Sequence, residues 1–273
     1  MNRYLKLVHM EVHRFRYVLA SLMGITILIQ FAALIWHVND ELAMNKKALI
    51  NTGFISDKMS FAEAIANTQF WFAIPIFLSI AVLCLYVFLI WYRDWAGRNT
   101  FVYRLLMLPT ARRNIYLAKL TAMMIFIFGL VAFQLLLLPI EHLIFKLIVP
   151  ADQIEPSYFM DTVSTNQVFI WLMPRHFDQF VLSYGLGIMA LIVVFTAIML
   201  ERSYRLIGIL FAVLYILACV FTVLFPLFAM GFEQSDSYLY PEEIWTIELV
   251  ICIALVTVSV WLGFRLLNKK ISV

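Results

Sequence analysis

Charged residues are scarce in this chain of 273 residues. Lys, Arg, Asp and Glu make up 14% of it, whereas a soluble domain has about a quarter, and hydrophobic residues make up 64% against about half. A soluble fold of this size has too little interior to bury so many apolar side chains. The composition therefore excludes a soluble protein and indicates an integral membrane protein.

Glycine is also rare, and none of the nine glycines precedes a lysine. A phosphate-binding loop of the type G-x-x-x-x-G-K-[ST] needs glycine amides to surround the phosphates and a lysine to neutralise them. We therefore expect no nucleotide site, cofactor or metal in this chain. If its function uses ATP, then ATP and Mg²⁺ are bound by an ATPase on a separate chain.

Cysteine chemistry is not indicated either. The three cysteines lie inside apolar runs, at Cys84, Cys219 and Cys252, and neither a C-x-x-C pair nor an H-E-x-x-H motif occurs. We interpret them as small hydrophobic residues rather than disulfide partners or metal ligands. The formal charge of +3 is small and the basic residues are scattered, which argues against nucleic acid as a partner.

What the chain does contain is long apolar runs. Six of them approach the length of about 20 residues that a bilayer requires. They cover residues 18–38, 70–92, 120–140, 180–200, 206–228 and 245–267, and the third can extend to 149. We predict an all-α integral membrane protein, a single domain over 1–273 with six transmembrane helices. Residues 201–205 alone separate spans four and five, which predicts a tight helical hairpin.

Residues 1–17 are too polar to be a span. Apolar side chains recur there at steps of three and four, at Leu5, Val8, Val12, Phe15 and Leu19. Polar ones follow the same rhythm on the opposite face, at Lys6, His9, His13 and Arg16. The pattern predicts an amphipathic elbow helix in the membrane surface, whose Lys6, His13, Arg14 and Arg16 face anionic lipid.

Basic residues set the orientation. With the N-terminus inside, most of them fall on the cytoplasmic side and most carboxylates fall outside. This predicts cytoplasmic N- and C-termini. Of the external connections, 39–69 contains a predicted short helix from Ser60 to Gln69. In 150–179 the apolar run Val168–Met173 is too short to span, so we expect it to rest at the outer interface with Trp171, without a separate soluble domain.

The connection 93–119 is strongly basic. It carries Arg93, Arg98, Arg104, Arg112, Arg113 and Lys119 against the single carboxylate of Asp94. Pro109 ends one helix and Thr110 can cap the next, which makes Phe101–Leu108 a predicted short surface helix. Its apolar block, Leu105-Leu106-Met107-Leu108, would be costly to expose and suits a groove on a partner. The arginines alone would also fit a purely topological role.

The run Leu106 to Lys119 resembles the segment L-x-x-P-x-[ST]R-x-x-[IL]-x-x-[AS]K of ABC-2-type transporter permeases, with Ala111 in place of the small hydroxyl residue. The elbow helix, six spans and one large cytoplasmic loop are also similar to that family. The resemblance implies a bacterial cytoplasmic-membrane exporter subunit that pairs with a second permease copy and with ABC ATPase subunits. It implies a cytoplasmic coupling helix between spans two and three, where the ATPase docks on Leu105, Leu106, Leu108, Pro109, Thr110, Arg112 and Arg113.

Two other functions remain open at this point. Glu242-Glu243 is similar to the paired glutamates of CAAX-type intramembrane proteases, although Ile247 stands where their E-E-x-x-x-R pattern has arginine. A passive membrane immunity protein would need no ATPase. Ionisable residues near the outer ends of spans, Glu141, His142, Lys146 and Glu248, are interpreted as interfacial, with a transport-coupling site as the alternative.

Overall fold

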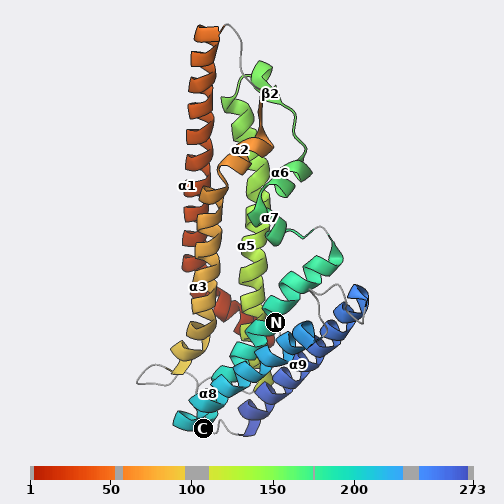
Figure 1. Ribbon diagram of the computed structural model, residues 1–273. Helices are drawn as coiled ribbons and strands as arrows, with labels where there is room; N and C mark the ends of the chain where they lie inside the picture. Colours follow the sequence, from red (N-terminus) through yellow and green to blue (C-terminus); the bar gives the residue numbers. More distant parts are fainter. Residues whose placement is uncertain (1–2, 53–57, 96–110, 175, 230–239, 270–273) are drawn as a thin grey trace. The chain divides into compact units, whose positions relative to one another are not determined.

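The computed structural model describes all residues except 1–2, 53–57, 96–110, 175, 230–239 and 270–273. Within the described residues, six helical segments are long and apolar enough to cross a membrane (Figure 1). They are Arg3–Ala48, Gln69–Trp95, Arg113–Ile148, Phe177–Tyr204, Ile207–Pro226 and Glu243–Asn268. The predicted class, an all-α membrane protein with six spans, is confirmed.

Contacts between residues divide the chain into two compact units. Unit 1 comprises Met1–Glu11, Leu85–Met123 and Val181–Val273, and unit 2 comprises Val12–Cys84 and Met124–Phe180. The helices α1 (Arg3–Thr52), α3 (Gln69–Trp95), α5 (Arg113–Ile148) and α8 (Phe177–Ala229) contribute residues to both units.

Helix α1 is longer than the sequence pattern suggested. The predicted elbow helix and first span are parts of one continuous helix of 50 residues, which also includes residues 39–52 of the expected external connection. At 1.5 Å per residue it is roughly 75 Å long, more than twice the roughly 30 Å of a bilayer core. The helix continues because residues 39–52 include good helix formers such as Glu41, Leu42 and Ala43, with neither proline nor glycine.

Short elements from two separate connections form a cap in unit 2. The first connection supplies β1 (Met59–Ser60) and α2 (Phe61–Asn67). The second supplies η1 (Ala151–Gln153), β2 (Ile154–Glu155), α6 (Phe159–Thr165) and α7 (Gln167–Leu172). Strands β1 and β2 pair in parallel, with Met59 opposite Ile154. The helix predicted at Ser60–Gln69 is confirmed as α2, since the Ser60 hydroxyl caps it by accepting from the Glu63 amide.

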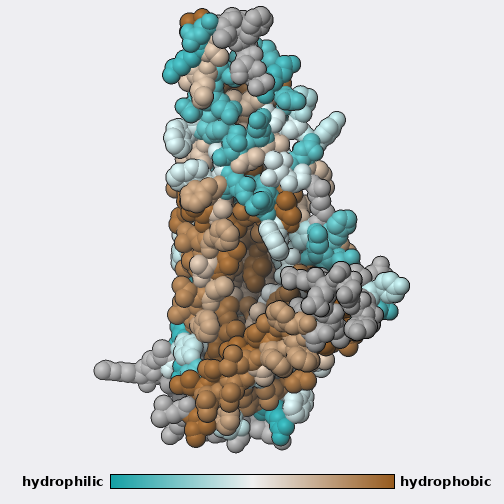
Figure 2. Space-filling view, viewed as in Figure 1, coloured by the Kyte–Doolittle hydropathy of each residue, from teal (hydrophilic) through white to brown (hydrophobic). Residues whose placement is uncertain are grey.

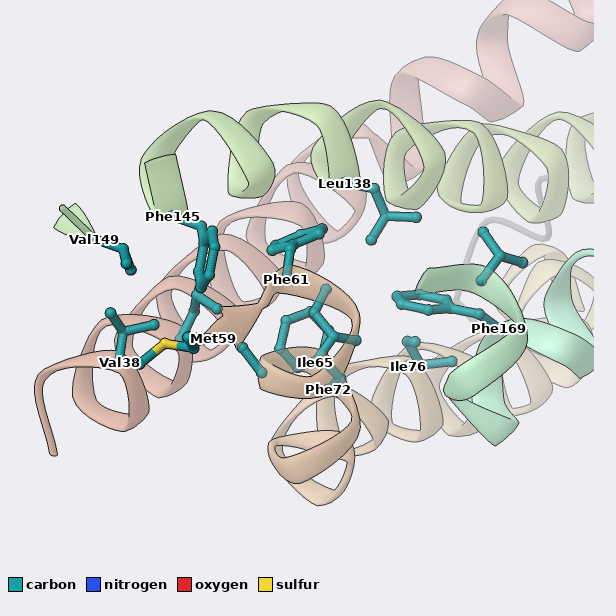
Figure 3. Packing of buried hydrophobic residues seen from close by; sticks show 13 residues of the cluster. Val38, Met59, Phe61, Ile65, Phe72, Ile76, Leu138, Phe145, Val149 and Phe169 are labelled. Carbon is teal, nitrogen blue, oxygen red and sulfur yellow. The ribbon is translucent and has the colours of Figure 1, made fainter. Parts of the chain in front are cut away.

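The cap closes over an apolar cluster shared with the long helices (Figure 3). Its members are Leu34, Val38, Met59, Phe61, Ala64, Ile65, Phe72, Ile76, Leu138, Phe145, Val149, Val163 and Phe169. Phe169 of α7 is 1% exposed. Phe169 therefore packs into the protein, whereas Trp171 is 74% exposed, and the expectation that residues 168–173 rest at the outer interface stays a prediction. The cap is not a separate domain, because α1, α3 and α5 supply much of this cluster.

The surface of unit 2 also differs in hydropathy between the region of the cap and the long helices. Figure 2 shows hydrophilic residues gathered over the far end of α1 and the β2 region, and apolar residues over the neighbouring lengths of α1 and α3. A helix with apolar side chains on its outer surface is stable in lipid, whose tails need no polar partner. On this face the region of the cap is therefore more hydrophilic than the helices beside it.

In unit 1 the helical run α8 (Phe177–Ala229) turns back on itself, as Figure 1 shows, before α9 (Pro241–Lys269). A side chain at Gly208 would lie 2.4 Å from the carbonyl oxygen of Glu201, although a straight helix separates residues seven apart by about 10 Å. The backbone therefore reverses between these residues. The hairpin expected at 201–205 is present, with arms Phe177–Tyr204 and Ile207–Pro226.

Candidate functional site at the ends of the 96–110 segment

Most of the predicted docking surface lies outside the described residues. Leu105, Leu106, Leu108, Pro109 and Thr110 fall in 96–110, as does the predicted coupling helix. The structure does describe both ends of this connection, where α3 ends at Trp95 and α5 begins at Arg113. The site can therefore be built from these two ends.

The two adjacent arginines have different surroundings. Arg112 is half-buried, and its Nη1 donates to the carbonyl oxygen of Leu267, 3.2 Å away in the last turns of α9. Helix C-termini leave carbonyls without intrahelical partners, and basic side chains commonly satisfy them. Arg113 is exposed. Arg112 therefore holds α9, and Arg113 is the arginine accessible to another molecule.

Four ionised side chains meet beside these ends, and we call Glu11, Arg93, Asp94 and Lys119 the Lys119 cluster. Lys119 is 2% exposed. Its Nζ lies 2.5 Å from Oδ2 of Asp94 and 3.3 Å from Oε1 of Glu11. It also donates to the carbonyl oxygen of Ile90 at 2.5 Å. The side chain of α5 is thus fixed to α1 and to the end of α3.

The cluster is balanced in charge. Nη2 of Arg93 donates to Oε2 of Glu11 at 3.0 Å, so two carboxylates face two cations. The Lys119 ammonium also lies 4.9 Å from the centre of the Trp91 ring, a cation–π contact. A buried charge is tolerated when it is paired and hydrogen-bonded, and removing one partner is strongly destabilising. The four side chains therefore depend on one another.

Sequence reasoning missed this cluster. Arg93 and Lys119 were counted among the basic residues of the loop, and Glu11 was given no role. One signal was present, because Glu11 lies three residues after Val8 and four before Phe15. These three side chains are buried on one helix face, with exposed fractions of 2%, 7% and 2% for Glu11, Val8 and Phe15. A carboxylate inside an apolar stripe indicates a buried partner.

The residues predicted to face anionic lipid are at least partly exposed. Lys6, His13 and Arg16 are exposed and Arg14 is partly exposed. The apolar side differs, because Leu5 is 50% exposed whereas Leu7 is 6% exposed. The buried face of this helix is therefore turned towards Leu7 and Glu11, and it binds protein where lipid was expected.

A second group ties α3 to the turn of α8. The Tyr92 hydroxyl donates to Oε2 of Glu201. The guanidinium of Arg202 lies over the Tyr92 ring at 4.5 Å and over the Trp95 ring at 5.7 Å. Arg202, counted in the sequence as a topological charge, thus also packs on the last turn of α3.

Aromatic packing adjoins the Lys119 cluster in unit 1. Tyr116 of α5 meets Phe195 of α8 edge-on at 5.8 Å and Phe264 of α9 at 5.6 Å. Trp91 of α3 meets the same Phe195 at 5.5 Å. Edge-to-face pairs at such distances are favourable beyond the area they bury. The start of α5 is therefore packed against α8 and α9 as well as bonded to α1 and α3.

The ionisable residues near the span ends have different surroundings. Glu141 is 0% exposed. His142 stacks edge-on against Phe61 of the cap at 4.8 Å, and Lys146 is exposed. Glu248 Oε1 is 3.8 Å from the Cys252 sulfur on the same helix. The Glu141 side chain is thus enclosed by protein, and whether these residues lie at the membrane interface stays a prediction.

Comparison with known proteins gives no assignment, since no family model, curated protein or solved structure matches this chain. Function must therefore be inferred from the residues and the geometry.

Proposed function

We propose that this chain is the membrane-spanning subunit of an ATP-driven exporter of the ABC-2 type. It moves an amphipathic or hydrophobic substrate, such as a peptide, lipid or drug, and uses ATPase subunits on separate chains. It pairs with a second permease copy in the bacterial cytoplasmic membrane, with both termini in the cytoplasm. The proposal rests on the sequence of the 93–119 connection together with the way its ends are held.

The observation that carries the proposal is the bonding of Lys119. In the permease pattern that this stretch resembles, the last three defined positions correspond to Ile115, Ala118 and Lys119, and all three are buried. Lys119 joins α5 to Asp94, which lies directly before the 96–110 segment, and to Glu11 of α1. A partner that displaces the 96–110 segment would therefore move the end of α3, the start of α5 and the start of α1 together.

Such a linkage suits a subunit that receives mechanical work from another protein. Packed interfaces switch between discrete arrangements and do not deform continuously, so a rigidly held loop transmits a displacement to the helices it joins. A loop attached by flexible ends would absorb the same displacement. The ATPase subunits would bind at the 96–110 segment, with Arg113 as the accessible cation beside it.

The protease alternative has less support. The carboxylate of Glu243 accepts a hydrogen bond from the Tyr240 amide at 3.0 Å. This contact caps the start of α9 and gives Glu243 a structural role. No observation in the described residues specifically favours a passive immunity protein.

Co-purification tests the proposal. The chain is expressed with its native genomic neighbours and purified in mild detergent, and bound proteins are assayed for ATP hydrolysis. We expect an ATPase to accompany the wild type and to be lost with Arg113→Glu. The matched control is Lys146→Glu, which reverses an exposed charge near the other end of the same helix and should retain the ATPase.

Either of two results would contradict the proposal. One is a folded wild-type protein that carries no ATPase and stimulates none when reconstituted in vesicles. The other is transport of the substrate in vesicles that contain no nucleotide.

A further inference from the structure

Within unit 2, helices α1 and α5 carry buried polar side chains where they contact each other. Nε2 of Gln134 donates to Oε1 of Gln30 at 3.1 Å, and both side chains are buried. On each helix, the residues that follow this pair enter the apolar cluster: Leu34 and Val38 on α1, Leu138 on α5. The two helices therefore run in the same direction from the glutamine pair.

Glu141 follows on the same face of α5. It lies three residues after Leu138 and four before Phe145, which are both 1% exposed, and Figure 3 shows these two side chains directed towards the cap residue Phe61. Positions at such spacing share a helix face. The Glu141 carboxyl group is therefore directed into the apolar interior beneath the cap.

This carboxyl group has no compensating partner in the described residues. Neither Oε1 nor Oε2 has a hydrogen-bond partner there. An ionised carboxylate buried without a partner costs many kcal/mol, so such a group is retained in its neutral form or binds a cation. A buried unsatisfied polar group in a folded protein calls for a functional explanation.

A metal ion does not fit this position. Among the residues that the structure describes, no three His, Cys, Asp or Glu side chains come together as a metal site. A hard cation would need six or more oxygen ligands. A proton needs only the one carboxylate.

The titratable groups on the elements around Glu141 are mostly directed to water. The charged ones that are exposed are Asp40, Lys46, Lys47, Lys58, Glu63, Lys146, Asp152, Glu155 and Asp161. His37, Glu41 and His142 are partly buried. His37 lies seven residues after Gln30 on α1, and Glu141 lies seven residues after Gln134 on α5. His37 and Glu141 are therefore at the same level of the two parallel helices. His37 Nε2 lies 3.2 Å from Oε1 of Glu41, which is 31% exposed.

We propose that Glu141 is a proton-binding site. With the cap closed, its carboxylate holds one proton and forms a neutral carboxylic acid. When the cap opens and water reaches the group, the O–H bond breaks and the proton leaves to water. This inference goes beyond the proposed transport function and does not depend on it.

Infrared spectroscopy of the full-length protein in detergent tests the proposal directly. A protonated buried carboxyl group gives a carbonyl-stretch band that shifts to lower frequency in D₂O and is absent from ionised carboxylates. Near neutral pH we expect this band in the wild type, its loss in Glu141→Gln, and its retention in Glu63→Gln, which changes an exposed carboxylate of the cap. Glu141→Asp keeps the acid in a shorter side chain and should shift the band, which assigns it if the glutamine variant does not fold.

The proposal is overturned if the wild type lacks the band near neutral pH, or if Glu141→Gln retains it. It is also overturned if sodium chloride removes the band from the wild type at constant pH, because the group would then bind a metal cation in place of the proton.

Discussion

Oε1 of Glu11 lies 3.3 Å from Nζ of Lys119, and each side chain is 2% exposed. The two residues are 108 positions apart in the chain. This contact joins the first helix of the protein to the helix that follows the 96–110 segment. It makes the polar start of α1 part of the protein core.

Replacement of Lys119 should destabilise the protein strongly. Lys119→Met removes the buried cation that pairs with Asp94, and breaking a buried pair in this way costs about 3–5 kcal/mol. Thermal unfolding in detergent measures the loss. Lys146→Met, an exposed lysine on the same helix, should leave stability within about 0.5 kcal/mol of wild type.

A double variant separates the lost pair from lost packing. Lys119→Met combined with Asp94→Asn removes both charges, so it should recover a large part of the stability lost by Lys119→Met alone. If the double variant is less stable than either single variant, the ion pair does not explain the effect.

The glutamine pair provides a second test. Gln134→Leu leaves the Gln30 amide without its partner in the interior of unit 2, which should cost about 1 kcal/mol. Adding Gln30→Leu removes the unpaired amide and should restore stability to near the wild-type value. Denaturation by heat, followed by circular dichroism, compares the three variants. An equal loss from Gln134→Leu and the double variant would show that the hydrogen bond contributes nothing.

Gly208 should not tolerate a side chain. A Cβ there would lie 2.4 Å from the Glu201 carbonyl oxygen and 2.8 Å from that of Leu200, both of them backbone atoms. Overpacking of this kind costs about 1–3 kcal/mol, so Gly208→Ala should lower the melting temperature. Gly187→Ala is the control on the same helical run, because nothing lies within 4 Å of a Cβ there. A Gly208→Ala variant as stable as the Gly187 control would contradict the tight turn.

The cap should loosen when its central aromatic residue is removed. Phe61 is 3% exposed and stacks on Phe145 at 5.6 Å. Truncation of a buried phenylalanine costs about 3–5 kcal/mol, so Phe61→Ala should raise hydrogen exchange in β1, α2 and β2. Phe70→Ala removes a ring that is 71% exposed and should not change exchange in the cap. Unchanged exchange in Phe61→Ala would show that the cap does not depend on this cluster.

The spans were predictable because lipid imposes a long, uniform requirement on the sequence. A segment that crosses the bilayer must satisfy its own backbone and present apolar side chains over about 20 residues, and this signal is local. The signal for helix α2 was local as well, since its capping residue Ser60 precedes it directly. The hairpin in α8 followed from the brevity of the polar stretch between two apolar runs.

The Lys119 cluster and the buried position of Glu141 were not predictable in this way. Arg93 and Glu11 are separated by 82 residues, so no local sequence pattern indicates their contact. Without knowledge of the fold, a basic residue that orients the chain and one that pairs inside it look the same in sequence.

The parallel pairing of Met59 with Ile154 sets an order of events during synthesis. When β1 and α2 leave the ribosome, their partner strand has not yet been made, and Met59 and Phe61 have no closed core to enter. The long α5 must be synthesised, and must cross the membrane, before β2 arrives. Pairings this distant in the chain form slowly because the intervening segment must first be closed into a loop. The cap is therefore completed late, and a chain interrupted before Ile154 would expose the apolar side chains that the finished protein buries.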